Sequence, residues 1–448
     1  MTRVITYGTF DLLHFGHVNL LKRAKALGDY LIVGVTSDDF DKRRGKINVK
    51  QSLTERIEAL RETGLADEII VEEYEGQKID DIKRLCVDIF AIGSDWVGKF
   101  DYLKEFCKVE YLPRTEGVSS TEKREVLQSV RFGLVGETAF MHKYANESEY
   151  VNGLHVVGLY AENTDNFNLA TKNLLTTKTY DEFLDDLDAV YIASLPKYHY
   201  EHIKHALMHG KHVLCESPIA QTKKECEELF ELAKEKHCIL MESIKTAYSI
   251  SYYRLLLLSK IGEIGNIVAI DSTCTSLMDP KINNLDNEWS SIQAWGPTAL
   301  LPVFQLLGGD YLSKKIVVAY LDKEKNFDAF TNIHMVYKNA VANIKVARGV
   351  KSEGELVISG TKACIHVPSP WWKTDYFEIR YENPTNNKRV FYQLDGEGIR
   401  YELLSFVRSI ASGNNLSYID KNTSLAIAQM LECFETKKDV TQIELKHQ

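Results

Sequence analysis

Runs of apolar residues in the first part of the chain alternate with stretches in which apolar residues recur at helical spacing. Positions 4–7 and 30–35 are apolar almost throughout, as are strands covered on both faces of a parallel sheet. Between these two runs the spacing is helical from 17 to 27. The alternation continues with apolar runs at 68–71, 88–92 and 109–112 and a helical stretch at 53–63. This order predicts an α/β domain with a parallel sheet.

The same pattern restarts at residue 130 and changes its character after residue 266. Val130–Gly136 is again an apolar run that ends in glycine, and further apolar runs at 155–160, 189–193 and 212–215 predict a second α/β domain. Short β-rich runs then follow at 267–275, 315–321, 333–337, 340–347, 355–359, 363–367, 377–381 and 389–393. With helical stretches at 398–411 and 422–436, this last part is expected to be an α+β domain with an antiparallel sheet.

An α/β chain of three domains is therefore predicted, with boundaries at residues 1–128, 129–250 and 251–448. The charged stretch Glu122–Ser129 is expected to join the first two domains.

Composition narrows the class of protein. Of 448 residues, 44% are hydrophobic and 26% charged, which is typical of soluble globular domains. The net charge of -9 disfavours a nucleic-acid partner. No apolar run approaches the roughly 18 residues of a membrane span, and the start has no secretory signal, so we expect a cytoplasmic protein without membrane insertion. Its eight cysteines are scattered without metal-ligand spacing and are expected to be thiols, with no metal site.

The strongest local signal is the segment Gly8–His17, in which a predicted strand ends at glycine and a helix opens. Helix starts favour anions because unpaired backbone N–H groups and the positive end of the helix dipole lie there. His14 and His17, three residues apart, fall on one face of that helix and can donate to phosphate oxygens. Gly16 leaves space for a phosphate to approach the backbone. The segment therefore predicts a phosphate site.

Three segments of this domain, Tyr7–His17, Gly93–Asp101 and Arg114–Thr121, resemble the cytidylyltransferase superfamily, in particular the bacterial glycerol-3-phosphate cytidylyltransferases. The resemblance implies a nucleotidyltransferase Rossmann-like fold that transfers CMP from CTP to glycerol 3-phosphate, giving CDP-glycerol and pyrophosphate. It also implies Mg²⁺ bound with CTP and a role in cell-wall polymer or capsule synthesis. Gly64 stands where the family commonly has an arginine, so the acceptor could be another small polyol phosphate.

The resemblance also implies roles for individual residues. The residues expected to bind phosphates and stabilise the transition state are His14, His17, Lys46 and Arg114. Those expected to bind the nucleotide are Thr9, Phe10, Asp11, Gly16, Asp95, Trp96, Thr115, Ser119 and Ser120. Nucleotidyl transfer needs positioning and charge neutralisation more than a covalent nucleophile, and these residue types supply both.

The rest of the chain resembles the Gfo/Idh/MocA family of NAD(P)-dependent oxidoreductases, first through residues 189–199 and 209–220. Shorter matches follow at 262–265, 354–362 and 396–402. The resemblance implies a second Rossmann domain followed by an open antiparallel sheet. It places cofactor contacts at Gly136, Glu162, Pro196, His199 and Glu216.

Two departures from that family bear on activity. The dinucleotide fingerprint keeps only Gly136, because Thr138 and Met141 stand at positions where a small residue is expected. Ser217 replaces the family's catalytic lysine and supplies no positive charge. These changes predict a degenerate oxidoreductase module that serves dimerisation or substrate handling, and they leave NAD(P) binding in doubt.

Two alternatives remain open. In a bifunctional enzyme, the second half would reduce a keto-phosphate with NAD(P)H to the polyol phosphate that the first half activates, with His199 or Lys245 replacing the missing lysine. The second alternative is a non-catalytic nucleotide sensor or scaffold. It is disfavoured because such a protein does not need residues that stabilise the charge of a transition state. Both families often form dimers, so a homo-oligomer is expected.

Overall fold

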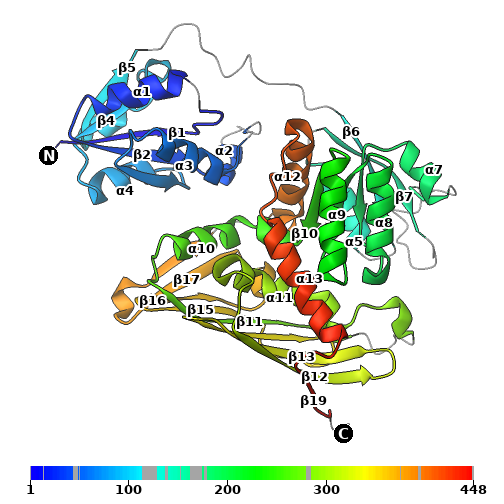
Figure 1. The fold of residues 1–448 in the computed structure, drawn as a ribbon. Helices are drawn as coiled ribbons and strands as arrows, with labels where there is room; N and C mark the ends of the chain where they lie inside the picture. The colour runs from blue at the N-terminus through cyan, green and yellow to red at the C-terminus, as the bar shows by residue number, and fades with distance from the viewer. Residues whose placement is uncertain are drawn as a thin grey trace. The chain divides into compact units, whose positions relative to one another are not determined.

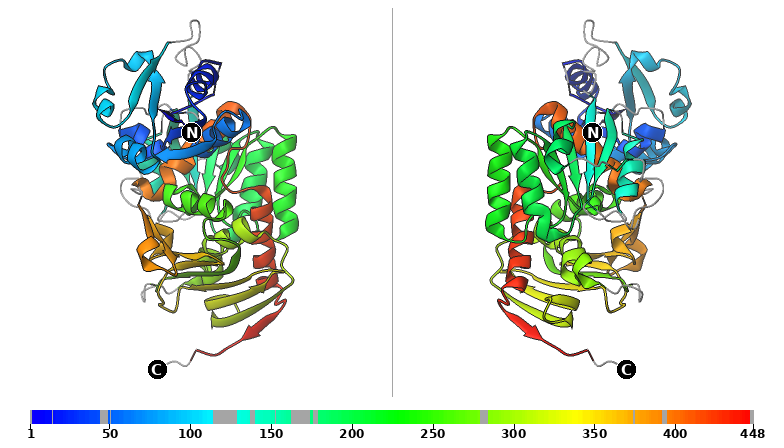
Figure 2. Two further views of the ribbon diagram at one scale, coloured as in Figure 1. Left: turned by 90° about the vertical axis from the view of Figure 1, so that its left-hand side faces the viewer. Right: turned by 90° about the vertical axis from the view of Figure 1, so that its right-hand side faces the viewer.

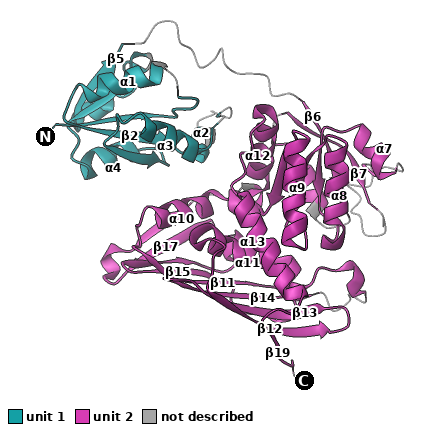
Figure 3. Cartoon of the chain, in the orientation of Figure 1, with its two compact units in different colours: residues 1–126 teal, residues 127–448 magenta. Residues whose placement is uncertain are grey.

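The computed structural model describes residues 2–445 except for 14, 44–48, 50, 114–128, 137–139, 152, 162–173, 176–178, 279–283, 374 and 392–394. The chain divides into two compact units, residues 1–126 and 127–448, which are coloured separately in Figure 3. We refer to them as the first and second units.

The first unit is built on a five-stranded sheet in the order β3-β2-β1-β4-β5, in which every pair of neighbours is parallel. The strands are β1 (Arg3–Gly8), β2 (Tyr30–Thr36), β3 (Glu68–Glu72), β4 (Ile89–Gly93) and β5 (Lys108–Leu112). The helices are α1 (Phe15–Lys25), α2 (Asp38–Arg43), α3 (Leu53–Glu62) and α4 (Gln77–Arg84), with short 3-10 turns η1 (Ser94–Trp96) and η2 (Asp101–Glu105). Figure 1 shows the course of these strands and helices. Two clusters of buried apolar residues cover the sheet, which explains why its central strands β1 and β2 are largely apolar.

The second unit begins with another five-stranded sheet, in the order β10-β9-β8-β6-β7 and again parallel throughout. Its strands are β6 (Val130–Val135), β7 (Leu154–Tyr160), β8 (Ala189–Ile192), β9 (His212–Glu216) and β10 (Leu240–Ser243). Its helices are α5 (Phe140–Ser148), α7 (Tyr180–Asp185), α8 (Pro196–Met208) and α9 (Lys223–Glu235). The strand order reverses beside β6, which is where open sheets of this kind bind ligands.

Two glycines on neighbouring strands of this sheet make room for one aromatic ring. A Cβ atom at Gly158 would lie 2.7 Å from the ring of Phe183, and one at Gly133 would lie 2.9 Å from that ring and 2.3 Å from the Leu187 side chain. Phe183 itself is buried. The ring therefore occupies the space that two side chains on β6 and β7 would otherwise fill.

The chain then forms a nine-stranded sheet in the order β18-β17-β16-β15-β11-β14-β13-β12-β19. Its strands are β11 (Ile267–Thr275), β12 (Ser313–Asp322), β13 (Phe327–Val336), β14 (Val341–Ala347), β15 (Leu356–Gly360), β16 (Ala363–Val367), β17 (Tyr376–Tyr381), β18 (Lys388–Phe391) and β19 (Val440–Gln442). The associated helices are α10 (Ile250–Lys260), α11 (Ser291–Leu307), α12 (Ile399–Ser412) and α13 (Lys421–Glu435). Figures 1 and 2 show α10 and α11 lying on one face of this sheet. Short 3-10 turns complete this part: η3 (Lys245–Tyr248), η4 (Leu285–Asn287), η5 (Trp371–Lys373), η6 (Pro384–Asn386) and η7 (Asp395–Gly398).

The predicted fold class is confirmed, with one refinement of the last sheet. Most of its pairings are antiparallel, but β11 pairs with β14, and β12 with β19, in parallel. One continuous apolar core joins β6 and α5 to α11 and this sheet. The predicted boundary at residue 250 therefore lies inside one compact unit. Among the described helices, none is long and apolar enough to cross a membrane.

Candidate functional sites

The turn after β1, in the first unit, holds two residues in an unusual backbone conformation. Phe10 and Leu12 have φ values of 54° and 47°, in the left-handed region that non-glycine residues rarely occupy. The Phe10 ring is buried, and a Cβ atom at Gly8 would lie 3.1 Å from it. Strain of this kind persists only where surrounding contacts impose it, and such positions cluster at functional sites.

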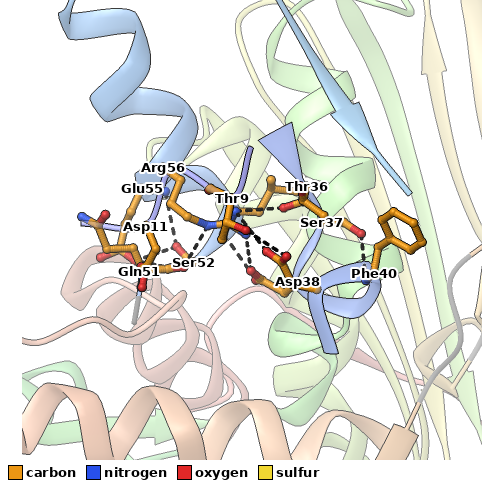
Figure 4. Close-up of polar contacts among 12 residues, drawn as sticks. Thr9, Asp11, Thr36, Ser37, Asp38, Phe40, Gln51, Ser52, Glu55 and Arg56 are labelled. Carbon is orange, nitrogen blue, oxygen red and sulfur yellow. Dashed lines mark hydrogen bonds and ion pairs between the residues drawn. The ribbon is translucent and has the colours of Figure 1, made fainter. Parts of the chain in front are cut away.

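Arg56, on α3, provides much of that constraint. It is fully buried and its Nη1 donates to the Thr9 carbonyl at 2.6 Å and the Thr36 carbonyl at 2.8 Å. Its Nε donates to the Gln51 carbonyl at 3.1 Å, and its Nη2 forms an ion pair with Asp38. Figure 4 shows the guanidinium at the centre of these contacts. One side chain thus joins the ends of β1 and β2 to the segment before α3.

Further hydrogen bonds attach the turn to residue 51. The Gln51 backbone N–H donates to Asp11 Oδ1 at 2.8 Å, and the Leu12 N–H donates to Gln51 Oε1 at 2.7 Å. The Thr9 hydroxyl donates to Asp41 Oδ1 at 2.9 Å. The predicted nucleotide-binding residues Thr9 and Asp11 are therefore held in place by protein groups on both sides of the turn.

His17 lies in the first turn of α1, directly after this strained turn. Its ring meets the Phe10 ring edge-on, with centroids 5.5 Å apart. The first turn of α1 carries no acidic residue, while Lys22, Arg23 and Lys25 lie in the last turn. The positive end of the helix dipole is therefore not neutralised by a neighbouring carboxylate of α1, which favours an anion there.

Trp96 and the backbone of Asp95 lie in η1, after β4. Because β4 neighbours β1 in the parallel sheet, η1 is at the same edge as the turn after β1. The Trp96 ring packs 5.7 Å from that of Phe100, and the Lys99 ammonium lies 5.1 Å from its centroid. The remaining predicted residues of this site lie outside the described residues: His14, Lys46, Arg114, Thr115, Ser119 and Ser120.

Arg56 is not among the site residues predicted from the sequence, although its position in the helical pattern carries a signal. Arg56 occurs among Leu53, Ile57 and Leu60, the apolar residues that give α3 its buried face. An arginine at a core-facing position is rarely buried without partners, so it indicates a buried polar network. Its acceptors are spread over distant residues and no local pattern names them.

A cavity of about 580 Å³ lies in the second unit, at the carboxyl edge of the β10-β9-β8-β6-β7 sheet. One wall comes from the strand ends, including Gly136, Glu216 and Ser243. The opposite wall comes from α11, η5 and the neighbouring loops, including Trp295 and Trp372. A nicotinamide dinucleotide of the kind that the fold implies binds at this edge in open parallel sheets.

The described residues fit such a group at the first strand end. Gly136 has φ 131°, and a Cβ atom there would lie 2.6 Å from the backbone of Ala193 and Ser194. Only glycine fits there, because the backbone of Ala193 and Ser194 fills the space of a side chain, and Gly136 itself lines the cavity where the fold places a pyrophosphate. Residues 137–139, which include Thr138, and the predicted contact Glu162 lie outside the described residues.

His199 and Pro196, two predicted cofactor contacts, lie behind the cavity in α8, which follows β8. Pro196 is the first residue of α8, and His199 is fully buried with its Nδ1 2.7 Å from the Pro218 carbonyl oxygen and its Nε2 2.7 Å from that of Ser194. Burial lowers the pKa of His199, against the effect of these two carbonyls. Neither residue lines the cavity. In place of the predicted direct contact, we expect both to hold the loops after β8 and β9 together.

A buried network of carboxyl and hydroxyl groups backs the cavity wall. The Tyr144 hydroxyl donates to Glu402 Oε2 at 2.6 Å, and Ser243 Oγ lies 3.0 Å from the same oxygen. The Tyr191 hydroxyl donates to Glu216 at 3.1 Å, and the Tyr144 and Tyr191 rings stack 3.7 Å apart. Burial raises the pKa of Glu402 to about 8, with a further contribution from Glu216, and raises that of Glu216 to about 7 despite the nearby Lys245.

The Glu402→Gln variant is expected to remove part of the pH dependence of stability. Between pH 4.5 and 8 the folded state keeps the Glu402 proton and the unfolded state releases it, so the contribution of Glu402 to wild-type stability falls as pH rises, by about 1.4 kcal/mol per pH unit. Glutamine is neutral at every pH. Urea unfolding between pH 5 and 8 should show a shallower loss of stability in the variant.

The matched control is Glu235→Gln, on the exposed surface of α9. It should retain the wild-type pH dependence. An unchanged slope in Glu402→Gln would mean that Glu402 is ionised in the folded protein.

Ser217 and Lys245 both line the cavity. The Ser217 hydroxyl donates to the buried carboxylate of Glu242, so its hydrogen is used within the protein. Lys245, after β10, forms an ion pair with Glu397. The cavity thus has a lysine, but from another strand end than the one that the resemblance indicates. From the sequence, Lys245 is predicted only as an alternative, and Glu397 and Lys373 are not predicted.

The known proteins that resemble this chain fall into two groups, one for each unit. Residues 5–126 match the family described as cytidylyltransferase-like. A glycerol-3-phosphate cytidylyltransferase of Bacillus spizizenii is 50% identical over 130 residues, which are 29% of this chain and 100% of that protein. One from Staphylococcus aureus is 46% identical over 127 residues, 28% of this chain and 96% of that protein.

Residues 130–244 match the oxidoreductase family with an NAD-binding Rossmann fold. A solved structure of a 3-ketoreductase from Actinomadura kijaniata with NADP and TDP-benzene is 18% identical, covers 71% of this chain and 100% of its own, and has a TM-score of 0.62. An aldose-aldose oxidoreductase from Caulobacter crescentus, solved with glycerol, is 16% identical with a TM-score of 0.60, over 69% of this chain and 97% of its own. At this identity the similarity shows the fold. Both predicted resemblances are confirmed.

Proposed function

The chain belongs, through its first unit, to the cytidylyltransferase-like family, and on this premise we propose that it transfers CMP from CTP to glycerol 3-phosphate, giving CDP-glycerol and pyrophosphate. The relatives support a nucleotidyltransferase, which confirms the predicted class of enzyme. Glycerol 3-phosphate is proposed as the acceptor because those relatives are glycerol-3-phosphate cytidylyltransferases. We further propose that Mg²⁺ binds with CTP, and that the enzyme is a cytoplasmic homo-oligomer.

The observation that carries the proposal is the turn held by Arg56 in front of α1. It places the Thr9–Asp11 backbone and His17 together at a helix start, where a phosphate chain is favoured. In this arrangement His17 donates a hydrogen bond to a phosphate oxygen and supports the charge that develops as pyrophosphate leaves. The acceptor phosphate, with a second pKa of about 6, is already largely dianionic at neutral pH and needs no general base.

Gly64 bears on the choice of acceptor. It has φ 63° directly after α3, and no atom lies within 4 Å of a Cβ placed there. The left-handed turn explains glycine at this position by backbone conformation. An arginine there would be strained, so we expect any positive charge near the acceptor to come from another residue.

Pyrophosphate release from CTP should test the proposal directly. With Mg²⁺ present, we expect turnover with glycerol 3-phosphate, and at least about 10-fold lower kcat/KM with glycerol 2-phosphate or C4 to C6 polyol phosphates, because the first is the acceptor named for the relatives. Preferred use of a longer polyol phosphate would retain the transferase and overturn the acceptor. Absence of turnover with every acceptor would contradict the proposal as a whole.

For the second unit, Ser217 supports a module that has lost oxidoreductase activity, because its hydroxyl donates to Glu242 and its side chain carries no charge.

A second candidate function is NAD(P)H-dependent reduction of a keto-phosphate, and the cavity that contains Lys245 favours it. When bound, the nicotinamide would supply the hydride. Gly136 would admit the pyrophosphate, and Lys245 would hold a proton facing the ligand. Adding keto-phosphate with NADPH to the assay above should leave pyrophosphate release unchanged if the module is inactive, and should start it without added polyol phosphate if the candidate is correct.

A further inference from the structure

Three lysines from separate parts of the second unit converge on one carboxylate at the edge of its cavity. Lys143 of α5 lies 3.0 Å from Glu397 Oε1, and Lys373 of η5 lies 3.4 Å from the same oxygen. Lys245 of η3 forms an ion pair with Glu397 Oε2. Burial by itself would raise the pKa of Glu397, but Lys245 and the other two lysines lower it to about 2, so it is ionised at neutral pH. We call these four residues the lysine cluster.

The backbone around Glu397 is bent to hold this position. Gly396, Glu397 and Gly398 have φ values of 58°, 54° and 92°, three consecutive residues in the left-handed region. A Cβ atom at Gly398 would lie 2.4 Å from the carbonyl oxygen of Lys245. The turn is therefore packed directly against Lys245, and a non-glycine residue occupies its strained centre, as is common at functional sites.

The cluster faces the cavity through two of its lysines. Lys245 and Lys373 line the cavity, and Lys373 follows Trp372, whose ring lies 4.8 Å from that of Trp295. An ammonium group has three N–H donors, and a phosphate entering the cavity could accept from Lys245 and Lys373 in competition with Glu397. The other charged groups that line the cavity are Glu216, Glu288 and Arg348, the last two paired with each other at 2.9 Å.

We propose that the cavity of the second unit binds the phosphate group of a small polyol or ketose phosphate through Lys245 and Lys373. A phosphate monoester brings up to two negative charges and three acceptor oxygens to one point, which suits convergent ammonium groups. The two indoles and the strand ends leave room for a short carbon chain in a cavity of this volume. This goes beyond the function proposed for the first unit, and the ligand is of the same chemical class as the acceptor proposed there.

Tryptophan fluorescence can report on this cavity in the full chain. Trp96 is the only tryptophan in residues 1–126, so Trp96→Phe leaves indoles only in the second unit. In this background, titration with glycerol 3-phosphate or dihydroxyacetone phosphate should change the emission of Trp295 and Trp372. Glycerol and dihydroxyacetone should bind at least about 10-fold more weakly. Because binding in the first unit is not observed by this signal, failure here and failure of the transferase assay are distinguishable.

Substitutions of single lysines test the contact itself. Lys245→Met and Lys373→Met should each weaken phosphate-ester binding by about 10-fold or more, while Glu397→Gln should hold or tighten it. The matched control is Lys388→Met on β18, whose ion pair with Glu263 lies outside the cavity lining. Far-ultraviolet circular dichroism and thermal unfolding identify variants that fail to fold. Lys245→Arg keeps the positive charge and should retain binding, and Lys373→Met tests the contact independently if Lys245→Met does not fold.

Competition with NADP⁺ separates the two sources of phosphate. The proposal expects the phosphate ester to bind alongside saturating NADP⁺. Displacement by NADP⁺ would assign the lysine cluster to the dinucleotide and overturn the proposal, as would equal binding of glycerol and glycerol 3-phosphate or undiminished binding in folded Lys245→Met and Lys373→Met.

Discussion

Replacing Arg56 by methionine is expected to lower the free energy of unfolding of the first unit by about 3–5 kcal/mol. The substitution leaves Asp38 and Asp41 without this guanidinium, and it removes the donor that the carbonyl groups of Thr9, Thr36 and Gln51 share. Methionine fills a similar volume, so the loss reports the polar contacts more than a cavity. Hydrogen exchange of β1 and β2, measured by mass spectrometry on the full chain, gives the local free energy of unfolding.

The control for this variant is Arg61→Met, one turn and a half further along the same helix. The Arg61 side chain is about half exposed and pairs only with Glu58, itself exposed, among the contacts described for it. Exposed pairs of this kind contribute about 0–1 kcal/mol. If exchange in β1 and β2 were equally slow in Arg56→Met and wild type, the Arg56 network would have no part in holding the turn after β1.

Replacing His17 by alanine is expected to lower kcat by about 10²- to 10³-fold while CTP binding is largely retained. The reason is that a donor aimed at the leaving pyrophosphate contributes more in the transition state than in the bound substrate. Phe10 also belongs to the buried apolar cluster of the first unit, so the turn keeps packing partners when the imidazole is removed. Steady-state pyrophosphate release and equilibrium binding of CTP measure the two effects.

His17→Asn, which keeps a hydrogen-bond donor, should recover part of the lost rate. A variant in which KM for CTP rises and kcat stays unchanged would show that His17 binds ground state and transition state equally, and would contradict the catalytic assignment. That outcome would also restore the nucleotide sensor as an alternative.

Features with a local cause could be predicted from the sequence. The central strands β1, β2, β6 and β8 are largely apolar because both faces of their sheets are covered, and the predicted helix at 422–436 differs by one residue from α13 at Lys421–Glu435. The glycines at Gly8 and Gly136, at the ends of the first strand of each sheet, mark the sheet edges at which both candidate sites are predicted. A glycine turn and the apolar spacing of a helix depend on residues close together in the sequence, so the sequence pattern predicts these features well.

Features that depend on distant partners could not be predicted. Lys245 and Glu397 are 152 residues apart and meet only because η3 and η7 pack together. The parallel pairing of β11 with β14 depends on the chain passing through α11 and a hairpin before it returns. Likewise, His199 matched a family position, but nothing in its neighbours indicated that both ring nitrogens face carbonyl groups in the interior.

The Phe183 ring between Gly133 and Gly158 constrains how this sheet can change during evolution. Alanine at Gly158 is harmful while the phenylalanine remains, and a smaller residue at 183 leaves a void while both glycines remain. At Gly133 the Leu187 side chain is nearer still, so alanine there needs a change at Leu187 as well as at Phe183. Substitutions here should therefore show sign epistasis, and related sequences are expected to vary together at Gly158 and Phe183, and at Gly133 together with Phe183 and Leu187.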